Sequence, residues 1–270
     1  MKGWTLSLVS PVSFGLDAAA MSTMVICDNE RDVCDISLAS SRPGSGVKVG
    51  DLFAVRASTD DHFTINGDVK FLHQLGKDWA AGALRIEGDV GIGLGTGMRG
   101  GSITVCGDSM MSAGCQMKGG AIRITGNTGD YLGGPLPGRR SGMSGGRIVV
   151  TGNAGHHAGH CMRRGTIVML GDVGDGIGSD MVAGTVVVGG RIGDFVGAGM
   201  RRGTIVLTHA ISLDPVRFTS PREVSLSMAQ LIASDLTLDA PEIAKAMTKP
   251  MKRCLGDRSV GGQGEILIAF

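Results

Sequence analysis

Apolar residues alternate with other residues over short stretches that begin with glycine, and these stretches return through the middle of the chain every 19 residues. The apolar residues occupy the third and fifth positions of each stretch, as at Leu84 and Ile86. Alternation on β-branched residues predicts a strand with one buried face, and six residues are too few for a helix. The copies begin at Gly82, Gly101, Gly120, Gly146, Gly165, Gly184 and Gly203.

The rest of each copy repeats a fixed order of residue types. A Gly-Asp or Gly-Asn dipeptide follows most of the predicted strands, and we expect such residues to form a corner because they tolerate left-handed or tight-turn conformations. A methionine then precedes the next copy by three positions. The dipeptides are Gly88-Asp89, Gly107-Asp108, Gly126-Asn127, Gly152-Asn153 and Gly171-Asp172, and the methionines are Met98, Met117, Met143, Met162, Met181 and Met200. One copy has 26 residues, and its seven extra residues fall at Pro135–Ser141.

A copy of this length has no room for a helical crossover, so consecutive strands are expected to stack as successive coils. Strands would then pair with their equivalents one coil away, at roughly 4.8 Å. Methionine suits such a narrow interior because its unbranched side chain adapts its shape. We therefore predict an all-β fold, a right-handed parallel β-helix (solenoid) with irregular N- and C-terminal caps.

The pattern divides the chain into three parts: N-terminal cap strands over 1–60, a β-helix of about seven coils over 61–207, and a C-terminal extension over 208–270. In the first part we predict strands at Trp4–Leu8 and Met24–Ile26, a turn at Pro43–Gly46, and a corner resembling those of the repeat at Val47–Asp51. The first coil, 61–81, is degenerate. It has Phe63 and Ile65 in the apolar positions, and Trp79 replaces methionine.

The extension carries no repeat and is punctuated by proline. Ser227–Ala233 and Pro241–Met247 are predicted short helices, and Glu265–Phe270 is a predicted strand. The extension could cap the coils or reach onto a partner, and the pattern does not decide between these.

Charge and cysteine content exclude several classes of function. The net charge is +1 and the isoelectric point is near 7.7, so we predict no nucleic-acid partner. No apolar run approaches the length of a membrane span, and Pro11 and Asp17 make the N-terminus a poor signal peptide. The six cysteines form no CxxC pair, which favours reduced thiols and a cytoplasmic protein.

Two stretches resemble ligand sites in part. The glycines of Gly91–Gly97 suggest a phosphate loop, but a strand follows them where that motif needs a helix, so we predict no nucleotide site. His156, His157, His160, Cys161 and Cys115 resemble metal ligands, and Asp130, His156, Asp175 and Asp194 fall in one column of the repeat. None has ligand spacing within a copy, so we interpret the histidines as solvated or hydrogen-bonded and predict no metal.

Basic residues stand just before the start of several copies, and stacked coils would align them as a stripe on one face. One interpretation is a solvated edge that resists aggregation. The other is recognition of an acidic partner surface or a polyanionic ligand, because arginine pairs well with carboxylates. The residues are Arg99, Lys118, Arg139, Arg140, Arg163, Arg164, Arg201 and Arg202. No Ser-His-Asp, Cys-His or paired-carboxylate unit is evident, so no catalytic residue and no cofactor are predicted in this chain.

The repeat, as it runs through Gly82–Gly101 and Gly146–Gly165, resembles that of the C subunit of formylmethanofuran dehydrogenase, which is shared with the C-terminal domain of the glutamate synthase large subunit. The resemblance covers about 60–207 strongly and the flanks loosely. The repeat begins well after Met1 with no amidotransferase or flavin domain before it, which favours the free-standing C subunit. Within that group the chain resembles the C subunit of the bacterial formyltransferase/hydrolase complex of methylotrophs, an impression that the insertion Pro135–Ser141 and the proline-punctuated extension fit.

This resemblance implies a non-catalytic structural or assembly subunit of a complex in one-carbon metabolism. That complex would transfer a formyl group from formyl-tetrahydromethanopterin to a methanofuran-type carrier and hydrolyse the product to formate. It implies A, B and D subunits as partners, with a dimer of heterotetramers as one arrangement, and places the carrier and the metal on those partners. Carriers of this type have glutamate-rich tails, so the basic stripe could be the matching surface.

Two alternatives stay open at this point. One is the C subunit of a molybdenum or tungsten formylmethanofuran dehydrogenase, which reduces carbon dioxide. The other is an independent β-helix protein or enzyme that binds a small molecule.

Overall fold

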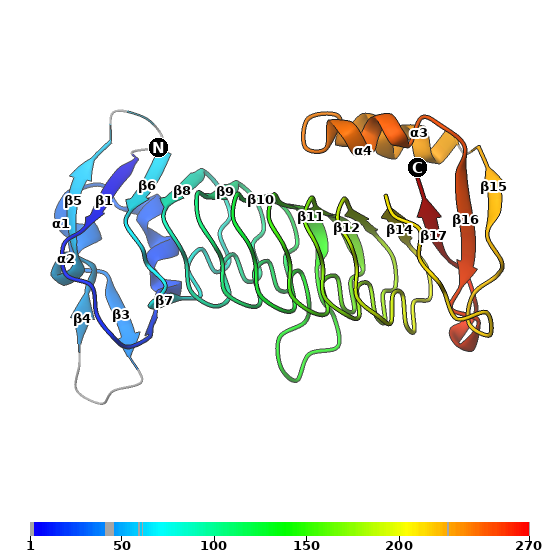
Figure 1. Cartoon of the computed structure of the whole chain (residues 1–270). Coiled ribbons are helices and arrows are strands. Elements are labelled where there is room, and N and C mark those ends of the chain that lie inside the picture. The colour runs from blue at the N-terminus through cyan, green and yellow to red at the C-terminus, as the bar shows by residue number, and fades with distance from the viewer. Residues whose placement is uncertain (1–2, 41–45, 59, 61, 226, 270) are drawn as a thin grey trace.

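The chain is mostly sheet. A computed structural model describes residues 3–40, 46–58, 60, 62–225 and 227–269. Its large sheet has 13 strands in the order β15-β16-β17-β14-β13-β12-β11-β10-β9-β8-β6-β1-β5. Figure 1 shows an elongated molecule with its N-terminal and C-terminal strands at opposite ends. Among the described residues, no helix has the length and apolar character needed to cross a bilayer.

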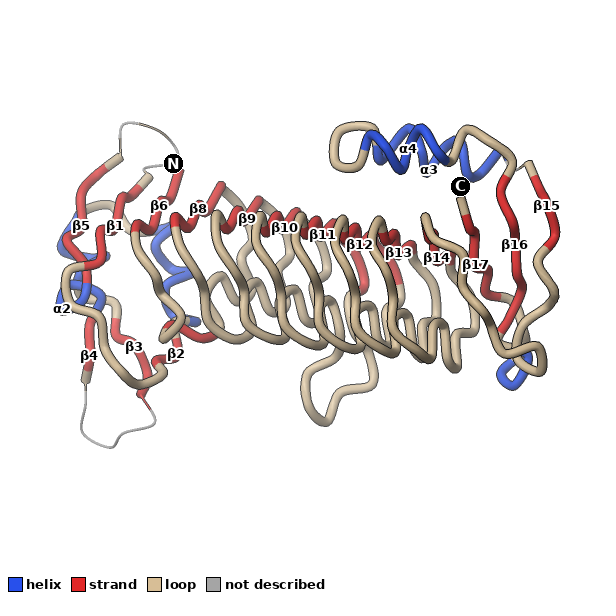
Figure 2. The backbone as a smooth tube through the Cα atoms, viewed as in Figure 1, coloured by secondary structure: helices blue, strands red, loops and turns tan. Residues whose placement is uncertain are grey.

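Seven strands correspond to the seven glycine-initiated copies, and all of them pair in parallel. Ile103 lies beside Ile122, and Ile122 beside Ile148, so equivalent residues of consecutive copies are partners, as predicted. A second line of parallel bridges joins Val90, Ser109, Thr128, Ala154, Val173 and Ile192. Figure 2 shows the chain winding through these copies, each of which we call a coil. The strands are β8 (Ala83–Glu87), β9 (Ser102–Val105), β10 (Ala121–Ile124), β11 (Ser144–Val150), β12 (Arg164–Met169), β13 (Thr185–Val188) and β14 (Thr204–Leu207).

The space enclosed by the coils is filled by the residues that the repeat placed in columns. All six repeat methionines, from Met98 to Met200, are fully buried, and so are the inward residues of the strands to within 2 %. Trp79 takes the methionine position in the degenerate first coil, where its ring packs edge-on against Phe63 at 5.4 Å between centroids. β6 (His62–Asn66) belongs to that coil and pairs in parallel with β8.

The Gly-Asp and Gly-Asn corners have a different cause from the one we expected. Their Asp and Asn residues are absent from the left-handed region. Instead, each side-chain oxygen accepts a hydrogen bond from the backbone N–H of its equivalent in the next coil, as in Asp89 Oδ1 with the Asp108 N–H at 2.6 Å. A Cβ atom at Gly107 would lie 2.3 Å from Asp89 Oδ1, so glycine precedes the acid to leave room for this bond. The same ladder continues through Asn127, Asn153, Asp172 and Arg191.

The left-handed positions lie elsewhere in each coil and include large side chains. Tyr131, His157 and Phe195 have φ of 60°, 59° and 60° and occupy one column of the repeat. Non-glycine residues seldom adopt this conformation, so it is imposed here by the turn directly before the buried residues Leu132, Ala158 and Val196. The column directs aromatic side chains outward, and Phe195 is 68 % exposed.

At the N-terminal end, the large sheet ends in two strands that run in opposite directions to each other. β1 (Trp4–Leu8), the predicted first strand, pairs in parallel with β6, while β5 (Phe53–Ala57) pairs with β1 in antiparallel. A small second sheet has the order β4-β3-β2-β7. Its strands and the nearby helices are β2 (Leu16–Asp17), the 3-10 helix η1 (Ala19–Ile26), α1 (Glu30–Cys34), β3 (Ser37–Ser40), β4 (Val47–Lys48), α2 (Val49–Leu52) and β7 (Leu72–His73).

Two predictions for this end were wrong. Met24–Ile26, predicted as a strand, is the last turn of η1, in which Met24 is buried and Ile26 exposed. An apolar triplet fits either element, and here it ends a helical segment that begins at Ala19. Val47–Asp51 is no corner of the repeat type, because α2 begins at Val49 and Asp51 accepts from the Lys48 N–H at its start. Of the turn predicted at Pro43–Gly46, Pro43, Gly44 and Ser45 lie outside the described residues.

The C-terminal end mirrors this arrangement. β17 (Gly264–Ile268) pairs in parallel with β14 and so adds one more strand to the stack, confirming a strand in Glu265–Phe270 apart from Phe270, which lies outside the described residues. β16 (Met251–Gly256) and β15 (Arg222–Val224) follow in antiparallel, with the short η2 (Arg258–Val260) between β16 and β17.

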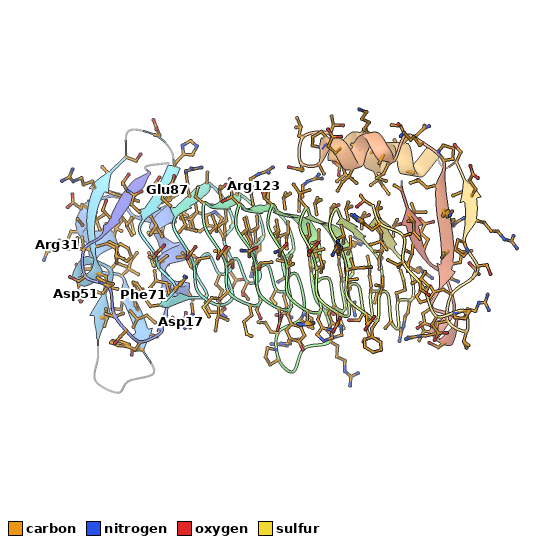
Figure 3. The ribbon with its side chains drawn as sticks, in the orientation of Figure 1. Asp17, Arg31, Asp51, Phe71, Glu87 and Arg123 are labelled. Atoms are coloured by element: carbon orange, nitrogen blue, oxygen red, sulfur yellow. The ribbon has the colours of Figure 1, made fainter. Side chains whose placement is uncertain are left out.

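Two helices of the extension lie over the outer face of the sheet. α3 (Ser227–Leu236) and α4 (Pro241–Ala246) confirm the predicted helices, and they bury the outward column formed by Val149, Val168, Val187, Val206 and Leu267. The equivalent positions in the earlier coils are Arg85, Thr104 and Arg123, which are exposed or half-buried. Figure 3 shows Arg123 on the same side of the sheet as the helices, and its guanidinium reaches Asp239.

Candidate functional site

The eight basic residues predicted as a site are all exposed. Four of them occupy one column of the stacked coils. The backbone N–H of each donates to the methionine or tryptophan carbonyl one coil earlier, as the Lys118 N–H donates to the Met98 carbonyl at 2.7 Å. Met98 directly precedes Arg99, the equivalent of Lys118. These four are Arg99, Lys118, Arg163 and Arg201. Ser144 and Val182 occupy the same column, so the basic groups are interrupted.

The remaining four basic residues lie beside that column or apart from it. Arg164 begins β12, and Arg202 donates from Nε to Gln263 at 3.0 Å. Arg201 and Arg202 line a cavity of about 440 Å³ with Val260 and Gln263. Arg139 and Arg140 lie on the inserted loop 135–141, where Arg139 lines a different cavity with Tyr131 and His160. Arg99 also pairs with Asp78 at 3.3 Å.

The histidine column is a hydrogen-bond ladder of the same kind as the corner ladder. The His156 N–H donates to Asp130 at 2.8 Å, and His156 Nδ1 accepts from the Asp175 N–H at 3.0 Å. The Asp194 N–H then donates to Asp175. The prediction that His156 and Asp175 are neighbours one coil apart is therefore confirmed, and this histidine is hydrogen-bonded as we interpreted it.

The other two histidines of the cluster, His157 and His160, lie against Tyr131. His157 stacks on Tyr131 with ring centroids 5.1 Å apart, and His160 meets the edge of Tyr131 at 6.3 Å. Tyr131 and His160 line a cavity of about 380 Å³ with Met111 and the loop residues 135–139. Five of the seven extra residues of the long coil, 135–139, thus form one wall of this cavity.

One group of side chains in the described residues offers three metal-ligand atoms close together. It consists of His160, Cys161 and Asp180, whose ligand atoms all lie within 4.8 Å of one another. Cys115 takes no part in it, because its thiol is buried against the Tyr131 carbonyl and this burial raises its pKa to about 11. Sequence reasoning omitted Asp180, although the 19-residue step from Cys161 leads to it.

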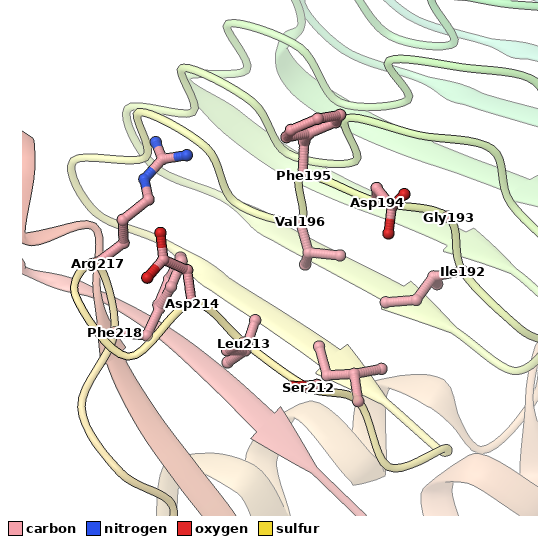
Figure 4. A pocket seen from close by; sticks show the side chains of 11 residues that line it. Ile192, Gly193, Asp194, Phe195, Val196, Ser212, Leu213, Asp214, Arg217 and Phe218 are labelled. Atoms are coloured by element: carbon pink, nitrogen blue, oxygen red, sulfur yellow. The ribbon is translucent and has the colours of Figure 1, made fainter.

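Residues of the C-terminal extension line further cavities in the described part of the chain, and two of these were not anticipated from the sequence. Figure 4 shows the first, of about 400 Å³, between Ile192–Val196 and the segment from Ile211 to Phe218. The second, of about 500 Å³, is lined by Thr219 and by Arg222, Arg253 and Arg258. Arg222 and Arg253 are directly opposite on β15 and β16, and Arg253 pairs with Glu265 at 2.9 Å.

A buried carboxylate fastens the extension to the last coil. Asp257 is fully buried and accepts hydrogen bonds from the Gly199 N–H at 3.0 Å and from Arg217 Nε at 2.9 Å. Burial alone would raise the pKa of Asp257, but these bonds and those from Ser259 outweigh it and hold the pKa well below the usual range. Asp257 thus has a structural explanation that needs no ligand.

The glycine-rich segment follows the coil pattern. Gly93, Gly95 and Gly97 lie in the left-handed region, and the chain continues into β9 rather than into a helix. A phosphate loop requires that helix, because its N-terminal N–H groups bind the phosphate. The segment therefore has the local structure that the repeat predicted.

Comparison with known proteins gives an informative likeness to a solved structure. No protein-family model matches the chain, and no curated protein matches it. The chain is similar to a chain of the X-ray crystal structure of the formyltransferase/hydrolase complex (FhcABCD) from Methylorubrum extorquens in complex with methylofuran. The two share 32 % identity and a TM-score of 0.89, over 98 % of this chain and 99 % of that one.

Proposed function

We propose that this chain, which belongs to the family of formyltransferase/hydrolase complex (FhcABCD) proteins represented by that structure, is the C subunit of such a complex. In this role it assembles with the A, B and D subunits. The complex would pass a formyl group from formyl-tetrahydromethanopterin to a methanofuran-type carrier and release formate, in cytoplasmic one-carbon metabolism.

The observation that carries the proposal is the extent of the match. Similarity covers both chains almost end to end, so it includes the caps and the C-terminal extension as well as the repeat. A shared coil alone would support only a shared fold. The likeness is to a formyl-transferring and hydrolysing complex, which favours the hydrolytic complex over a molybdenum or tungsten dehydrogenase.

The geometry suits a role in assembly. We interpret the stacked coils as the right-handed parallel β-helix expected from the repeat. In such a solenoid each coil contacts its neighbours, and the side-chain ladder through Asp89, Asp108 and Asn153 joins consecutive corners. The result is a stiff surface along which partner proteins keep a constant separation. The chemistry would then belong to those partners, which would also hold the carrier and the metal.

The basic column is the surface we assign to an acidic partner or to the carrier's carboxylate-rich tail. Arg163 and Arg201 are exposed, lie on the same column two coils apart, and have no ion pair within the described part of the chain. Arginine on a rigid coil loses little conformational freedom when it pairs with a carboxylate. Reversal of both charges to Glu is expected to weaken assembly or carrier affinity by roughly 10-fold or more.

The matched control for that experiment is Arg56→Glu, which changes an exposed arginine on the edge strand β5. Binding is measured with the assembled complex by titration of the carrier and by native mass. If the double reversal and the control behave alike, the column has no recognition role. The proposed place in the complex would survive that result, because it does not depend on the column.

Assembly itself is tested by co-expression of this chain with the A, B and D subunits from the same organism, with the affinity tag on the first of these. This chain is expected to co-purify in a constant ratio to the other three. Partners that assemble without it would contradict the proposal. Recovery of the chain with a pterin-metal protein would favour the dehydrogenase, and turnover or binding of an organic small molecule by the chain alone would favour an independent protein.

A further inference from the structure

Two neighbouring coils bring a histidine, a cysteine and a carboxylate to one place. His160 and Cys161 are adjacent in sequence, and Asp180 is the equivalent of Cys161 in the next coil. Cys161 and Asp180 have the same left-handed backbone, with φ of 53° each. Their N–H groups are fixed by bonds to the carbonyls of Ser179 and Ala198 at 2.9 and 2.7 Å. The backbone that carries the three side chains is therefore rigid.

The three side chains offer ligand atoms that all lie within 4.8 Å of one another. Bonds of about 2.3 Å to sulfur and about 2.0 Å to nitrogen place two ligands of a tetrahedral zinc ion roughly 3.5 Å apart. Cys161 Sγ lies 3.5 Å from His160 Nε2 and 3.8 Å from His160 Nδ1. The Asp180 carboxylate lies 3.9 Å from the other ring nitrogen, Nδ1, and its side chain is 64 % exposed, so it is free to rotate toward Nε2.

A second observation concerns the orientation of the imidazole. His160 Nδ1 lies 3.1 Å from the Ser179 carbonyl oxygen and 2.9 Å from the Ser179 hydroxyl. In the tautomer that carries its proton on Nδ1, this nitrogen donates to the Ser179 carbonyl. Nε2 then keeps its lone pair, on the atom nearest to Cys161 Sγ. Metal-bound histidines commonly donate their other ring N–H to a backbone carbonyl in this way.

We propose that His160 Nε2, Cys161 Sγ and Asp180 form a binding site for a divalent transition metal, with zinc as the best match. Imidazole, thiolate and carboxylate are the three ligand types that zinc accepts. Softer sites have more sulfur, and magnesium or calcium sites have oxygen alone. Thiolate coordination by Cys161 releases the thiol proton to solvent, and no electron is transferred.

The fourth coordination position would be open. His160 lines the cavity of about 380 Å³ whose other walls include Tyr131, Met111 and the inserted loop with Arg139. A water molecule or a donor atom from a bound anion could reach the metal from this side. Three protein ligands with one open position are typical of reactive rather than purely structural zinc. This inference does not depend on the proposed place of the chain in a formyltransferase/hydrolase complex.

The test is calorimetric titration of zinc into the full-length chain. The wild-type chain is expected to bind one zinc ion, and Cys161→Ser, His160→Ala and Asp180→Asn should each weaken binding by about 100-fold or more. Cys106→Ser and Asp194→Asn remove a half-buried thiol and an exposed carboxylate on other coils and should leave the affinity unchanged. Circular dichroism and thermal unfolding identify any variant that does not fold.

Cobalt offers an independent readout of the thiolate ligand. Cobalt added to the wild-type chain should give a thiolate-to-metal charge-transfer absorption that is lost in Cys161→Ser and kept in Cys106→Ser. Absence of zinc binding by the wild-type chain overturns the proposal. So does equal binding by Cys161→Ser with the same cobalt spectrum, because the ion would then occupy another place.

Discussion

The Arg147 guanidinium on β11 donates from Nε to Asp239 at 2.6 Å, 92 residues farther along the chain. Asp239 lies between α3 and α4, and its side chain is only 9 % exposed. Arg123 on β10 reaches the same carboxylate. Two consecutive coils thus hold the connection between the helices, which locates the helix pair along the sheet.

Asp239→Asn is expected to destabilise the fold by about 1–3 kcal/mol, because two arginines lose a shared and largely buried charge. Asp235 also contacts Arg147 but is 61 % exposed, so Asp235→Asn is the matched control. It should cost less than about 1 kcal/mol. Urea unfolding of the full-length variants measures both effects. Equal effects from the two variants would show that burial of Asp239 is unimportant.

Val187 tests the apolar contact beneath the helices. It is fully buried in the outward column of the sheet and packs in the cluster that includes Leu236 and Ile243. Val187→Ala should therefore cost about 1–3 kcal/mol. Thr104 occupies the equivalent position on β9, beyond the helices, and Thr104→Ala should change stability by less than about 0.5 kcal/mol. A similar effect at both positions would argue that the helices do not cover this face in solution.

Asn153 tests the ladder at the corners. Its Oδ1 accepts from the Asp172 N–H at 2.8 Å, and its own N–H donates to Asn127. Asn153→Ala removes the first bond and should cost about 0.5–1.5 kcal/mol, since water can reach the exposed Asp172 N–H. Arg191→Ala is the control, because the Arg191 N–H donates to Asp172 while its side chain adds no acceptor. If thermal unfolding shows that Arg191→Ala lowers the melting temperature more than Asn153→Ala does, the stabilising role of the corner ladder is contradicted.

Asp257 makes the free energy of unfolding depend on pH in the acidic range. Its pKa in the folded chain lies below the unfolded value of about 3.9, so the ionised form stabilises the fold above that pH. The contribution is lost as the pH falls through the folded pKa. Asp257→Asn should therefore cost about 2–4 kcal/mol at neutral pH, and the difference from wild type should shrink below about pH 4. Denaturant unfolding at several pH values checks this, and a difference that is independent of pH would refute it.

The coils were predictable because their signal is local and repeated. Alternation at Ile103 and Val105 indicates a strand, and the 19-residue step alone places each residue beside its equivalent. Met24–Ile26 was predicted wrongly because three consecutive apolar residues show neither the alternation of a strand nor the spacing of a helix. The sequence contained a signal for the docking of α3 and α4 that we did not use. The outward column changes from Thr104 and Arg123 to one valine in each of four consecutive coils, beginning at Val149.

The candidate site was predictable only in part. Column arithmetic placed His156 beside Asp175, and the same arithmetic leads from Cys161 to Asp180. The cavity beside the inserted loop could not be derived, because its shape depends on the path that Pro135–Ser141 takes near Tyr131. The left-handed backbone conformation of Tyr131 could not be predicted from the sequence either. Residues in its column range from glycine to phenylalanine, so their composition carries no conformational signal.

The central claim is that this chain organises a formyl-transferring complex without performing its chemistry. The most direct test is the rate of formate release by the A, B and D subunits, measured without this chain, with it, and with this chain alone. We expect full activity only from the four together, a marked loss without this chain, and no turnover by the chain alone. Formate release by the isolated chain, or an undiminished rate in its absence, would contradict the account.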